Sequence, residues 1–276
     1  MNVASLGFRT DLMLRRAGRS AVTDHGDHLL VRTPTNPGYY WGNFLLVGAE
    51  PAQAARWLSV FTTAFPQAGH VAIGLDGTSW DESATAGRCA AGLTPDVSSV
   101  LTAARLRPPR RGTTGAQVRV LTTDDDWQQA LALRLSIDEE EGVPQRSFVE
   151  RKLLESRVLT DTGAGAWFGA FVDGRMRAGL GVFTDGAGLA RYQSVETHPD
   201  FRRRGLAATL VCAAGEYAAD RLAARTLVIV ADPGYHAIEL YRALGFAAVE
   251  TRVQLQRAPD PGVLSSPGEQ NTPRSR

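Results

Sequence analysis

The feature that most constrains the fold is a strand, a tight loop and a helix in immediate succession. Residues 189–197 have strand character, residues 206–222 carry one apolar helical stripe, and His198-Pro-Asp-Phe-Arg-Arg-Arg-Gly205 lies between them. A glycine at a helix start leaves the first-turn N–H groups pointing into the loop, where they form a cradle for phosphate or pyrophosphate. The loop alone is also compatible with a solvated arginine corner.

The rest of the second half alternates strands and helices around this segment. Asp173-Gly174 and Asp185-Gly186 are hairpin turns, which predict an antiparallel meander. The expected strands are 118–121, 166–172, 175–183, 189–197, 227–230 and 246–256, and the expected helices begin at 124, pass through 148–154, and cover 206–222 and 235–244. This order predicts an α/β (α+β) fold with a mixed, largely antiparallel central sheet flanked by helices.

The first half gives weaker signals in a similar order. It predicts strands at 28–32, 39–47, 70–75 and 97–106, with helices at 52–65 and 81–91. This order repeats that of the second half from Leu189 onward. A divergent internal duplication and an unrelated α/β cap both account for it. The aromatic segment Pro37–Asn43 either lines a cleft for a substrate or packs in the core and its turns.

Two segments without apolar periodicity mark the expected boundaries. Residues 107–117 are rich in Pro, Gly and Arg and read as a linker, and residues from 258 onward read as a polar tail. We therefore expect an α/β domain over 1–112, a second domain over 113–257 and a disordered tail over 258–276.

Charge and cysteine content exclude several classes of protein. Thirty basic and 29 acidic residues leave a net charge of +1, which argues against a whole-chain nucleic-acid binder. Cys89 and Cys212 are too few for a disulfide framework or a structural zinc site, and His25, His28 and His70 lack metal-ligand spacing. No secretory signal and no apolar stretch long enough to span a bilayer is apparent, so we expect a cytoplasmic protein without membrane or metal.

Two motifs carry a resemblance to a known family. Residues 195–207, Val-Glu-Thr-His-Pro-Asp-Phe-Arg-Arg-Arg-Gly-Leu-Ala, resemble the acetyl-CoA-binding motif of the GNAT N-acetyltransferase superfamily. Residues 237–246, Ala-Ile-Glu-Leu-Tyr-Arg-Ala-Leu-Gly-Phe, resemble its second signature. The resemblance covers about half of the chain and implies a GNAT fold there. No arginine-glycine cradle precedes the helix expected at 52, so the first half would be a degenerate GNAT-like domain that binds no CoA.

The resemblance implies where an acetyl-CoA donor would bind. Backbone amides of Val195 and Thr197 would pair with the pantetheine arm, and amides over 203–208 would hold the pyrophosphate. The implied cofactor-binding residues are Val195, Thr197, Arg202, Arg203, Arg204, Gly205, Leu206, Ala207 and Ala208. Tyr235 and His236 either line the far wall of this site or face solvent.

The same resemblance suggests Tyr241 as the general acid for the departing thiolate. The alternative is a tyrosine packed over the sheet. The family often has Asn seven residues before this tyrosine, where this chain has Gly234. This chain therefore lacks the side chain that would make one of the family's contacts to cofactor or substrate.

Glu196 is the candidate base for the acceptor ammonium, with an ordinary surface carboxylate as the alternative. His198 is a weaker candidate. The acidic run 138–141 would attract a cationic amine or form a solvated helix end. Strand alternation places Glu196 on the opposite face from Val195 and Thr197.

These observations favour an acetyl-CoA-dependent N-acetyltransferase that acts by direct transfer in a ternary complex. A non-catalytic acyl-CoA-binding or regulatory module is the alternative, and a nucleic-acid binder built on the arginine clusters is a third, weaker hypothesis. The expected acceptor is a small-molecule or peptide amine whose identity the sequence does not reveal. Monomer and homodimer both remain open.

Overall fold

The computed structural model describes residues 1–48, 54–80, 92–109, 112, 115–141 and 146–257. Its described residues form two compact units. Unit 1 comprises Met1–Val100, Ala231–Gly234 and the chain from Val249, and unit 2 comprises Leu101–Val230 and Tyr235–Ala248. The helix predicted over 81–91 and the tail predicted over 258–276 lie outside the described residues.

Unit 1 is a small α/β layer built mainly from the N-terminal part of the chain. Its elements are α1 (Leu6–Ala17), β1 (Ala21–Asp24), β2 (His28–Arg32), the 3₁₀ turn η1 (Tyr40–Gly42), β3 (Phe44–Gly48), α2 (Ala54–Ala64), β4 (Val71–Asp76), the first part of β5 (Thr94–Ala103) and most of β11 (Ala247–Arg257). The strand order β1-β2-β3-β4-β11 is antiparallel except for the parallel pair β3–β4, which α2 connects.

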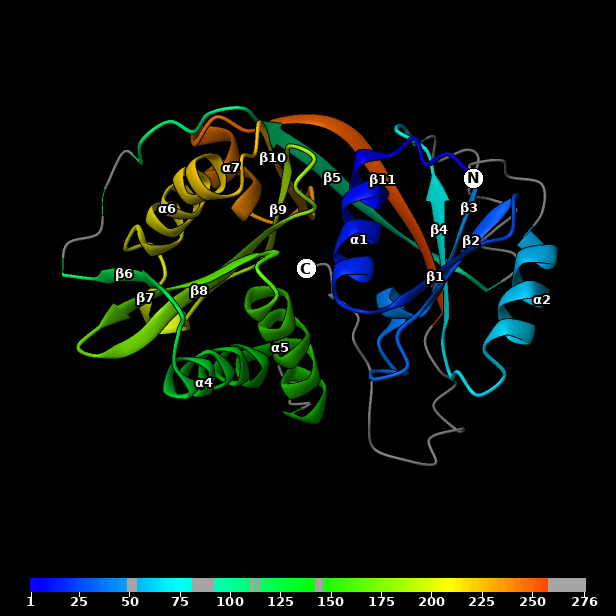
Figure 1. The fold of residues 1–276 in the computed structure, drawn as a ribbon, viewed down its shortest axis with the longest axis horizontal. Helices are drawn as coiled ribbons and strands as arrows, with labels where there is room; N and C mark the ends of the chain where they lie inside the picture. The colour runs from blue at the N-terminus through cyan, green and yellow to red at the C-terminus, as the bar shows by residue number, and fades with distance from the viewer. Residues whose placement is uncertain (49–53, 81–91, 110–111, 113–114, 142–145, 258–276) are drawn as a thin grey trace. The chain divides into compact units, whose positions relative to one another are not determined.

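The core of unit 1 lies where the two helices cover its strands. α1 and α2 lie on opposite sides of strands β1–β4 (Figure 1). Phe8 of α1 is 0% exposed and Phe61 of α2 is 1% exposed, and both belong to one apolar cluster with the strand residues. Burying one such aromatic side chain stabilises a fold by about 2–3 kcal/mol. The helices are therefore held by their apolar faces.

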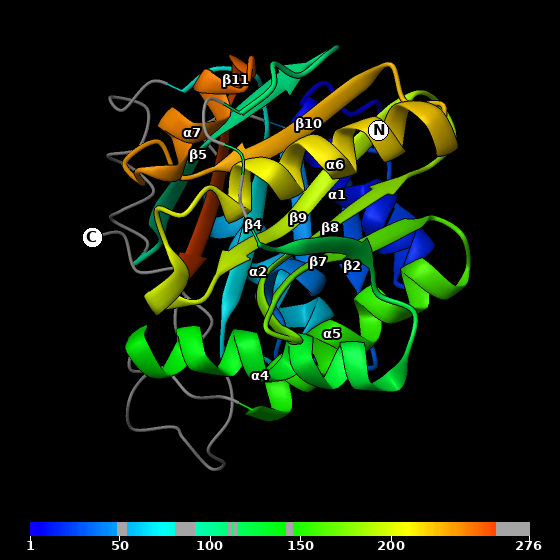
Figure 2. The same cartoon turned by 90° about the vertical axis from the view of Figure 1, so that its left-hand side faces the viewer.

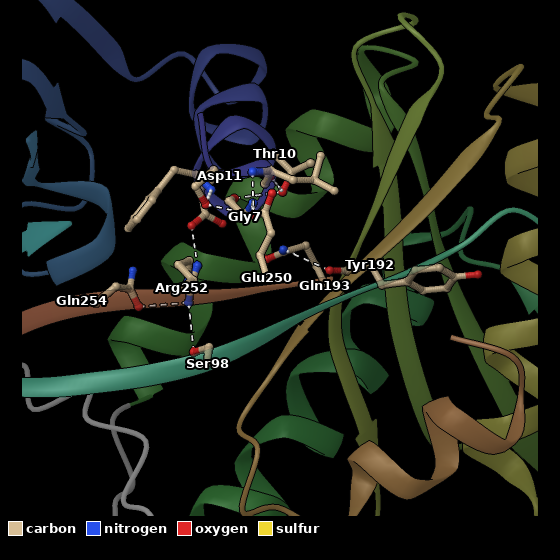
Figure 3. Close-up of polar contacts among 12 residues, drawn as sticks. Gly7, Thr10, Asp11, Ser98, Tyr192, Gln193, Glu250, Arg252 and Gln254 are labelled. Carbon is tan, nitrogen blue, oxygen red and sulfur yellow. Dashed lines mark hydrogen bonds and ion pairs between the residues drawn. The ribbon is translucent and has the colours of Figure 1, made fainter. Parts of the chain in front are cut away.

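The last strand of the chain completes unit 1. Residues 253–257 of β11 pair antiparallel with residues 71–75 of β4. Arg252 donates hydrogen bonds to Asp11 of α1, Ser98 of β5 and Gln254, as Figure 3 shows. Only 11% of the Arg252 side chain and 19% of the Asp11 side chain is exposed. This largely buried ion pair joins the end of the described chain to its beginning.

Unit 2 has a longer sheet and more helices. Its elements are β6 (Gln117–Val120), α4 (Asp124–Glu141), α5 (Arg146–Asp161), β7 (Gly165–Val172), β8 (Arg175–Thr184), β9 (Leu189–Thr197), the 3₁₀ turn η4 (Pro199–Phe201), α6 (Leu206–Arg221), β10 (Thr226–Ala231) and α7 (Ala237–Ala243). The strand order is β5-β10-β9-β8-β7-β6, with β5 contributing its last residues from Leu101. Pairing is antiparallel over β9-β8-β7-β6 and parallel between β9 and β10, which α6 connects.

Helices cover both faces of the sheet in unit 2. α6 lies on one side of strands β7–β9, and α4 and α5 lie on the other (Figures 1 and 2). The predicted apolar stripe of α6 faces the sheet, because Leu206 is 2% exposed and Leu210, Ala214 and Ala218 are each 0% exposed. This packing fixes the direction of α6 and therefore the place where its N-terminus emerges.

The predicted fold class is confirmed: the structure is a mixed, largely antiparallel α/β fold. Both units contain the same sequence of elements, an antiparallel strand followed by two parallel strands with a helix between them. This shared topology favours the internal duplication over an unrelated cap. Among the described helices, none is long and apolar enough to cross a membrane.

One sequence prediction for unit 1 was wrong, and two of its elements were not predicted. The strand expected over 39–47 begins only at Phe44, because Tyr40–Gly42 form a 3₁₀ turn. α1 and β1 were not predicted at all. The signals for α1 were nevertheless present: the Ser5 side chain caps the helix, Phe8 and Leu12 share its buried face, and Arg15 and Arg16 occupy its last turn.

Candidate functional site

The parallel strands β9 and β10 stop pairing before either strand ends. Their recorded register ends with Val228 opposite Arg191, whereas β9 continues to Thr197 and β10 to Ala231. Beyond this point, no pairing between the two strands is recorded among the described residues. Backbone N–H and C=O groups on the facing edges are therefore available to an extended ligand that binds as a strand would.

A bulge in β9 accompanies this separation. Gly181 of β8 lies opposite Gln193, but Gly179 lies opposite Glu196, so β9 contains one residue more than β8 over this stretch. Ser194, inside the bulge, has a φ of 48°, in the left-handed region that non-glycine residues rarely adopt. A bulge bends its strand and increases the local twist. The end of β9 that carries Val195 and Thr197 is thus turned relative to its first residues.

The loop after β9 ends in an open helix N-terminus. Gly205 is the N-cap of α6 with a φ of 81°, and Arg203 also has a left-handed φ of 63°. No side chain caps the helix, and both the N–H and the hydroxyl of Thr209 donate to the Gly205 carbonyl at 3.0 Å. No described residue is recorded as accepting from the N–H groups of residues 203–208. These donors and the helix dipole form a site for an anion.

The side chains around this cradle divide into two groups. Leu206 is 2% exposed and Ala208 8% exposed, so both contribute to an anion site only through their backbone. Arg203 and Arg204 are exposed, and Arg202 is partly buried. The structure therefore places the predicted cradle residues together at one helix end, with main-chain donors at its centre and guanidinium groups around it.

Tyr241 lies in α7 with 5% of its surface exposed. Its ring packs edge-on against Phe246 at 6.2 Å, and Phe246 packs edge-on against Tyr192 of β9 at 6.0 Å. This aromatic row positions α7 against the strand that carries the bulge. Burial, and to a smaller extent the nearby Tyr235, raises the pKa of the Tyr241 hydroxyl.

A tyrosine hydroxyl is already protonated at neutral pH, and the raised pKa makes that of Tyr241 a weaker acid. Its protonated state excludes a role as base and leaves it able to donate a hydrogen bond or a proton. No hydrogen bond of this hydroxyl is recorded with any described residue. The group is also not among the fully buried polar atoms that lack a partner. It is therefore available to a ligand.

The segment before α7 is exposed. The Gly234 N–H donates to the Asp232 carboxylate at 2.7 Å, which closes a tight turn. Tyr235 is 45% exposed, and its ring contacts that of His236 at 4.1 Å. In this structure both aromatic side chains face solvent, the alternative that the sequence left open.

Glu196 is held in an ion-pair network with α4. The Arg134 guanidinium lies 3.3 Å from the Glu196 carboxylate and 2.5 Å from Asp138, one turn further along the helix. The side chains of Glu196 and Asp138 are 11% and 8% exposed. Asp138, the first residue of the predicted acidic run, is therefore buried and paired, not solvated. No contact between Glu196 and Tyr241 is recorded.

The aromatic segment of unit 1 is a packing motif. Asn43 accepts from the Thr33 N–H and donates to the carbonyls of Asn36, Pro37 and Tyr39, so it organises the turn. Tyr40 is 2% exposed. The core-and-turn interpretation of this segment is correct.

Sequence reasoning missed three residues near the predicted site. Arg134 was not considered, because its importance comes only from the contact between α4 and β9. Arg177 of β8 and Phe201 of η4 were also missed, although Phe201 lies inside the motif, two residues before Arg203. Their guanidinium and ring come together only in the folded chain. Among the described residues, no group of His, Cys, Asp and Glu could hold a metal ion.

Comparison with known proteins decides the family of this region. The model of the acetyltransferase (GNAT) family matches residues 127–246, a range that contains β9, the open end of α6 and Tyr241. Residues 127–246 form a GNAT domain. No curated protein matches the sequence of the chain.

The similarity of this chain to solved structures extends beyond the GNAT domain. A GCN5-related N-acetyltransferase from Kribbella flavida has 17% sequence identity and a TM-score of 0.63, and the match covers 93% of this chain and 96% of that one. The enzyme from Sphaerobacter thermophilus has 18% identity and a TM-score of 0.61, with 87% and 84% covered. A tandem GNAT protein from the clavulanic acid biosynthesis pathway has 16% identity and a TM-score of 0.53, with 88% and 84% covered. At these identities the likeness shows the fold alone.

Proposed function

We propose that this protein is an acetyl-CoA-dependent N-acetyltransferase that transfers the acetyl group directly to an amine in a ternary complex. The observation that carries the proposal is the combination of unpaired strand edges at β9 and β10 with an uncapped α6. The backbone of Val195 and Thr197 lies on such a strand edge and suits the amides of the pantetheine arm. The N–H groups of residues 203–208 suit the pyrophosphate.

The chemistry follows from the positions of two side chains. The free amine attacks the thioester carbonyl, a C–N bond forms and the C–S bond breaks. Tyr241, protonated at neutral pH, donates its proton to the departing thiolate and regains one from the nitrogen of the newly formed amide. Glu196 takes the proton of the acceptor ammonium, directly or through water, while Arg134, which also pairs with Asp138, holds its carboxylate in place.

Removal of the Tyr241 hydroxyl tests the acid role. Tyr241→Phe is expected to lower kcat about 100-fold with little change in the Kd for acetyl-CoA, since general acids contribute roughly 10²- to 10⁴-fold. Thiol release from acetyl-CoA with a panel of amines measures kcat, and calorimetric titration measures Kd. Tyr217→Phe is the control, because the Tyr217 ring of α6 packs against Phe168 of β7 and its change should leave both values unchanged. An unchanged kcat in Tyr241→Phe would remove the acid role.

The base role predicts a pH-dependent defect. Glu196→Gln is expected to lower kcat about 100-fold near neutral pH, and the defect should shrink as pH rises, because more of the acceptor amine is then unprotonated. A pH series of initial rates measures this, with the exposed Glu216→Gln as control. A defect of equal size at every pH would indicate that Glu196 only positions the strand.

The alternative is a non-catalytic acyl-CoA-binding or regulatory module. Gly234, at the place where the family often has Asn, favours it because one contact is missing. It predicts that acetyl-CoA raises the melting temperature while no amine yields product. The catalytic proposal predicts both binding and thiol release, and absence of any binding would overturn both. We further propose a cytoplasmic enzyme with a small-molecule or peptide acceptor and no nucleic-acid partner, active as a monomer or homodimer.

A further inference from the structure

Phe201, in the turn between β9 and α6, contacts two arginine side chains. The guanidinium carbon of Arg177 lies 4.5 Å from the centre of the Phe201 ring, and that of Arg204 lies 4.7 Å from it. The His198 ring meets Phe201 edge-on at 5.7 Å. One aromatic ring therefore holds two cationic groups in place.

The loop is anchored at this point by its backbone. The His198 N–H donates to the Arg177 carbonyl at 2.8 Å, and the Phe201 N–H donates to the His198 carbonyl at 2.9 Å. Arg177 belongs to β8, whereas Arg204 directly precedes the N-cap of α6. The pair of guanidinium groups, which we call the Arg177–Phe201–Arg204 stack, is thus fixed beside the amide cradle.

Neither guanidinium of the stack has a carboxylate partner within the part of the chain that the structure describes. The Nε atom of Arg177 is also buried without a hydrogen-bond acceptor. Stacking uses the face of a guanidinium and leaves its in-plane N–H groups free to donate. Two positive groups that lack a counter-ion and are held by one ring form a preorganised site for an anion.

We propose that the Arg177–Phe201–Arg204 stack binds the ribose 3′-phosphate of CoA and so selects CoA over its dephosphorylated form. The inference rests on the proposed function, because it needs acetyl-CoA in the adjacent cradle. A phosphomonoester is close to a dianion at neutral pH and offers three acceptor oxygens. Paired guanidinium groups match this charge and geometry better than lysines would.

Titration of the full-length protein with acetyl-CoA and with acetyl-dephospho-CoA tests the proposal. The wild type should bind acetyl-CoA at least about 10-fold more tightly, and the preference should increase at low salt because the contact is ionic. In the double variant Arg177→Ala/Arg204→Ala the two ligands should bind within about 2-fold of each other. Arg175→Ala, an exposed arginine on the same strand, is the matched control and should keep the full preference.

A second variant separates the stack from its charges. Phe201→Leu keeps both arginines but removes the ring, and it should lose most of the preference while still binding acetyl-dephospho-CoA as the wild type does. That unchanged affinity also shows that the variant is folded. If the wild type binds both ligands equally, the inference is wrong although the proposed function stands. If the wild type binds neither ligand, the proposed function fails and the inference falls with it.

Discussion

The two units contain the same parallel strand pair, connected by a helix, but only one pair opens. In unit 1 the pairing of β3 and β4 runs to the final residues, with Gly48 opposite Asp76. In unit 2 the recorded pairing of β9 and β10 ends at Val228 and Arg191, before either strand does. The same topology therefore leaves unpaired strand edges between β9 and β10 but not between β3 and β4.

Side chains of unit 1 pack closely over its parallel strands β3 and β4. The Phe8 ring of α1 lies so close to Gly74 of β4 that a Cβ there would be 2.6 Å from it. Leu46 of β3 is 3.0 Å from the same position. An aromatic side chain of the protein thus covers these strands. The bulge at Ser194, in the β8–β9 pairing, also has no counterpart in the matching β2–β3 pairing of unit 1, which runs without a register shift.

The first amides of α1 in unit 1 and of α6 in unit 2 also differ in their hydrogen-bond partners. In unit 1 the Asp76 carboxylate accepts from the N–H groups of Ala4 and Ser5 at 2.9 Å, and Glu250 accepts from Leu6 at 2.8 Å. The amides at the start of α1 are thus satisfied by carboxylates of the protein itself. The helix that connects the parallel strands of unit 1 is α2, and the residues just before it lie outside the described ranges. In unit 2, by contrast with α1, the first-turn donors of α6 have no acceptor among the described residues. The candidate site therefore consists of main-chain groups of β9, β10 and α6 that the described residues do not pair.

The largest effect is expected from a carboxylate placed at the start of α6, where it would pair with the amides that are now unpaired. Gly205→Asp places an acidic side chain at the N-cap, where it accepts from the cradle amides and repels a pyrophosphate. We expect acetyl-CoA affinity to fall about 1000-fold, or roughly 4 kcal/mol, with the fold retained. Calorimetric titration measures this. Gly186→Asp, at a positive φ of 78° with open space around it, controls for backbone strain and should bind normally.

Acid should separate the stabilities of the two units. His70 is 4% exposed in unit 1, and burial lowers its pKa to about 4, although its hydrogen bond to the Asn43 carbonyl opposes this shift. The unfolded chain takes up the proton near pH 6.5 and the folded unit only near pH 4. The free energy of unfolding of unit 1 therefore falls by about 3 kcal/mol as pH drops through this window.

Hydrogen exchange measured from pH 7 to pH 4 checks this, with His70→Phe as the variant that should remove the pH dependence. In unit 2 the Arg119 guanidinium holds the pKa of Asp126 far below its usual range, so that interaction persists throughout the window. Unit 1 amides should lose protection first. Equal loss in both units would contradict the assignment to His70.

The smallest effect is expected from a change in the packing of α1 on β4 in unit 1. Gly74→Ala forces the Phe8 ring to shift, which should destabilise the protein by about 1–2 kcal/mol and leave the affinity for acetyl-CoA unchanged. Urea unfolding measures the stability. Gly48→Ala on β3 is the control, since no atom lies within 4 Å of its added Cβ. A loss of acetyl-CoA affinity in Gly74→Ala would show that unit 1 takes part in binding.

Local sequence signals were sufficient for much of unit 2. β9 spans the predicted residues, and the stripe from Leu206 to Ala218 is buried as its helical period requires. The cradle was predictable from the sequence because a glycine at a helix start leaves the N–H groups of the next few residues without a side-chain cap. Tyr241 was found through its motif, and its role in catalysis stays a prediction.

Contacts distant in sequence were not predictable. The bulge at Ser194 depends on the register with β8, and the partner of Glu196 is Arg134 on another element. The position of the last strand in unit 1 depends on its pairing with β4, about 180 residues earlier in the chain. No local propensity contains this information, because each contact forms only when remote segments meet.

The central claim is that the donor site lies at the open ends of β9 and β10 and the start of α6. It is tested most directly by titrating the full-length protein with acetyl-CoA while mapping hydrogen exchange. The account predicts one molecule bound per chain, with new protection at residues 195–197 and 203–208 and none in β3 or β4. Two molecules per chain, or protection at β3 and β4 without any at the start of α6, would contradict it.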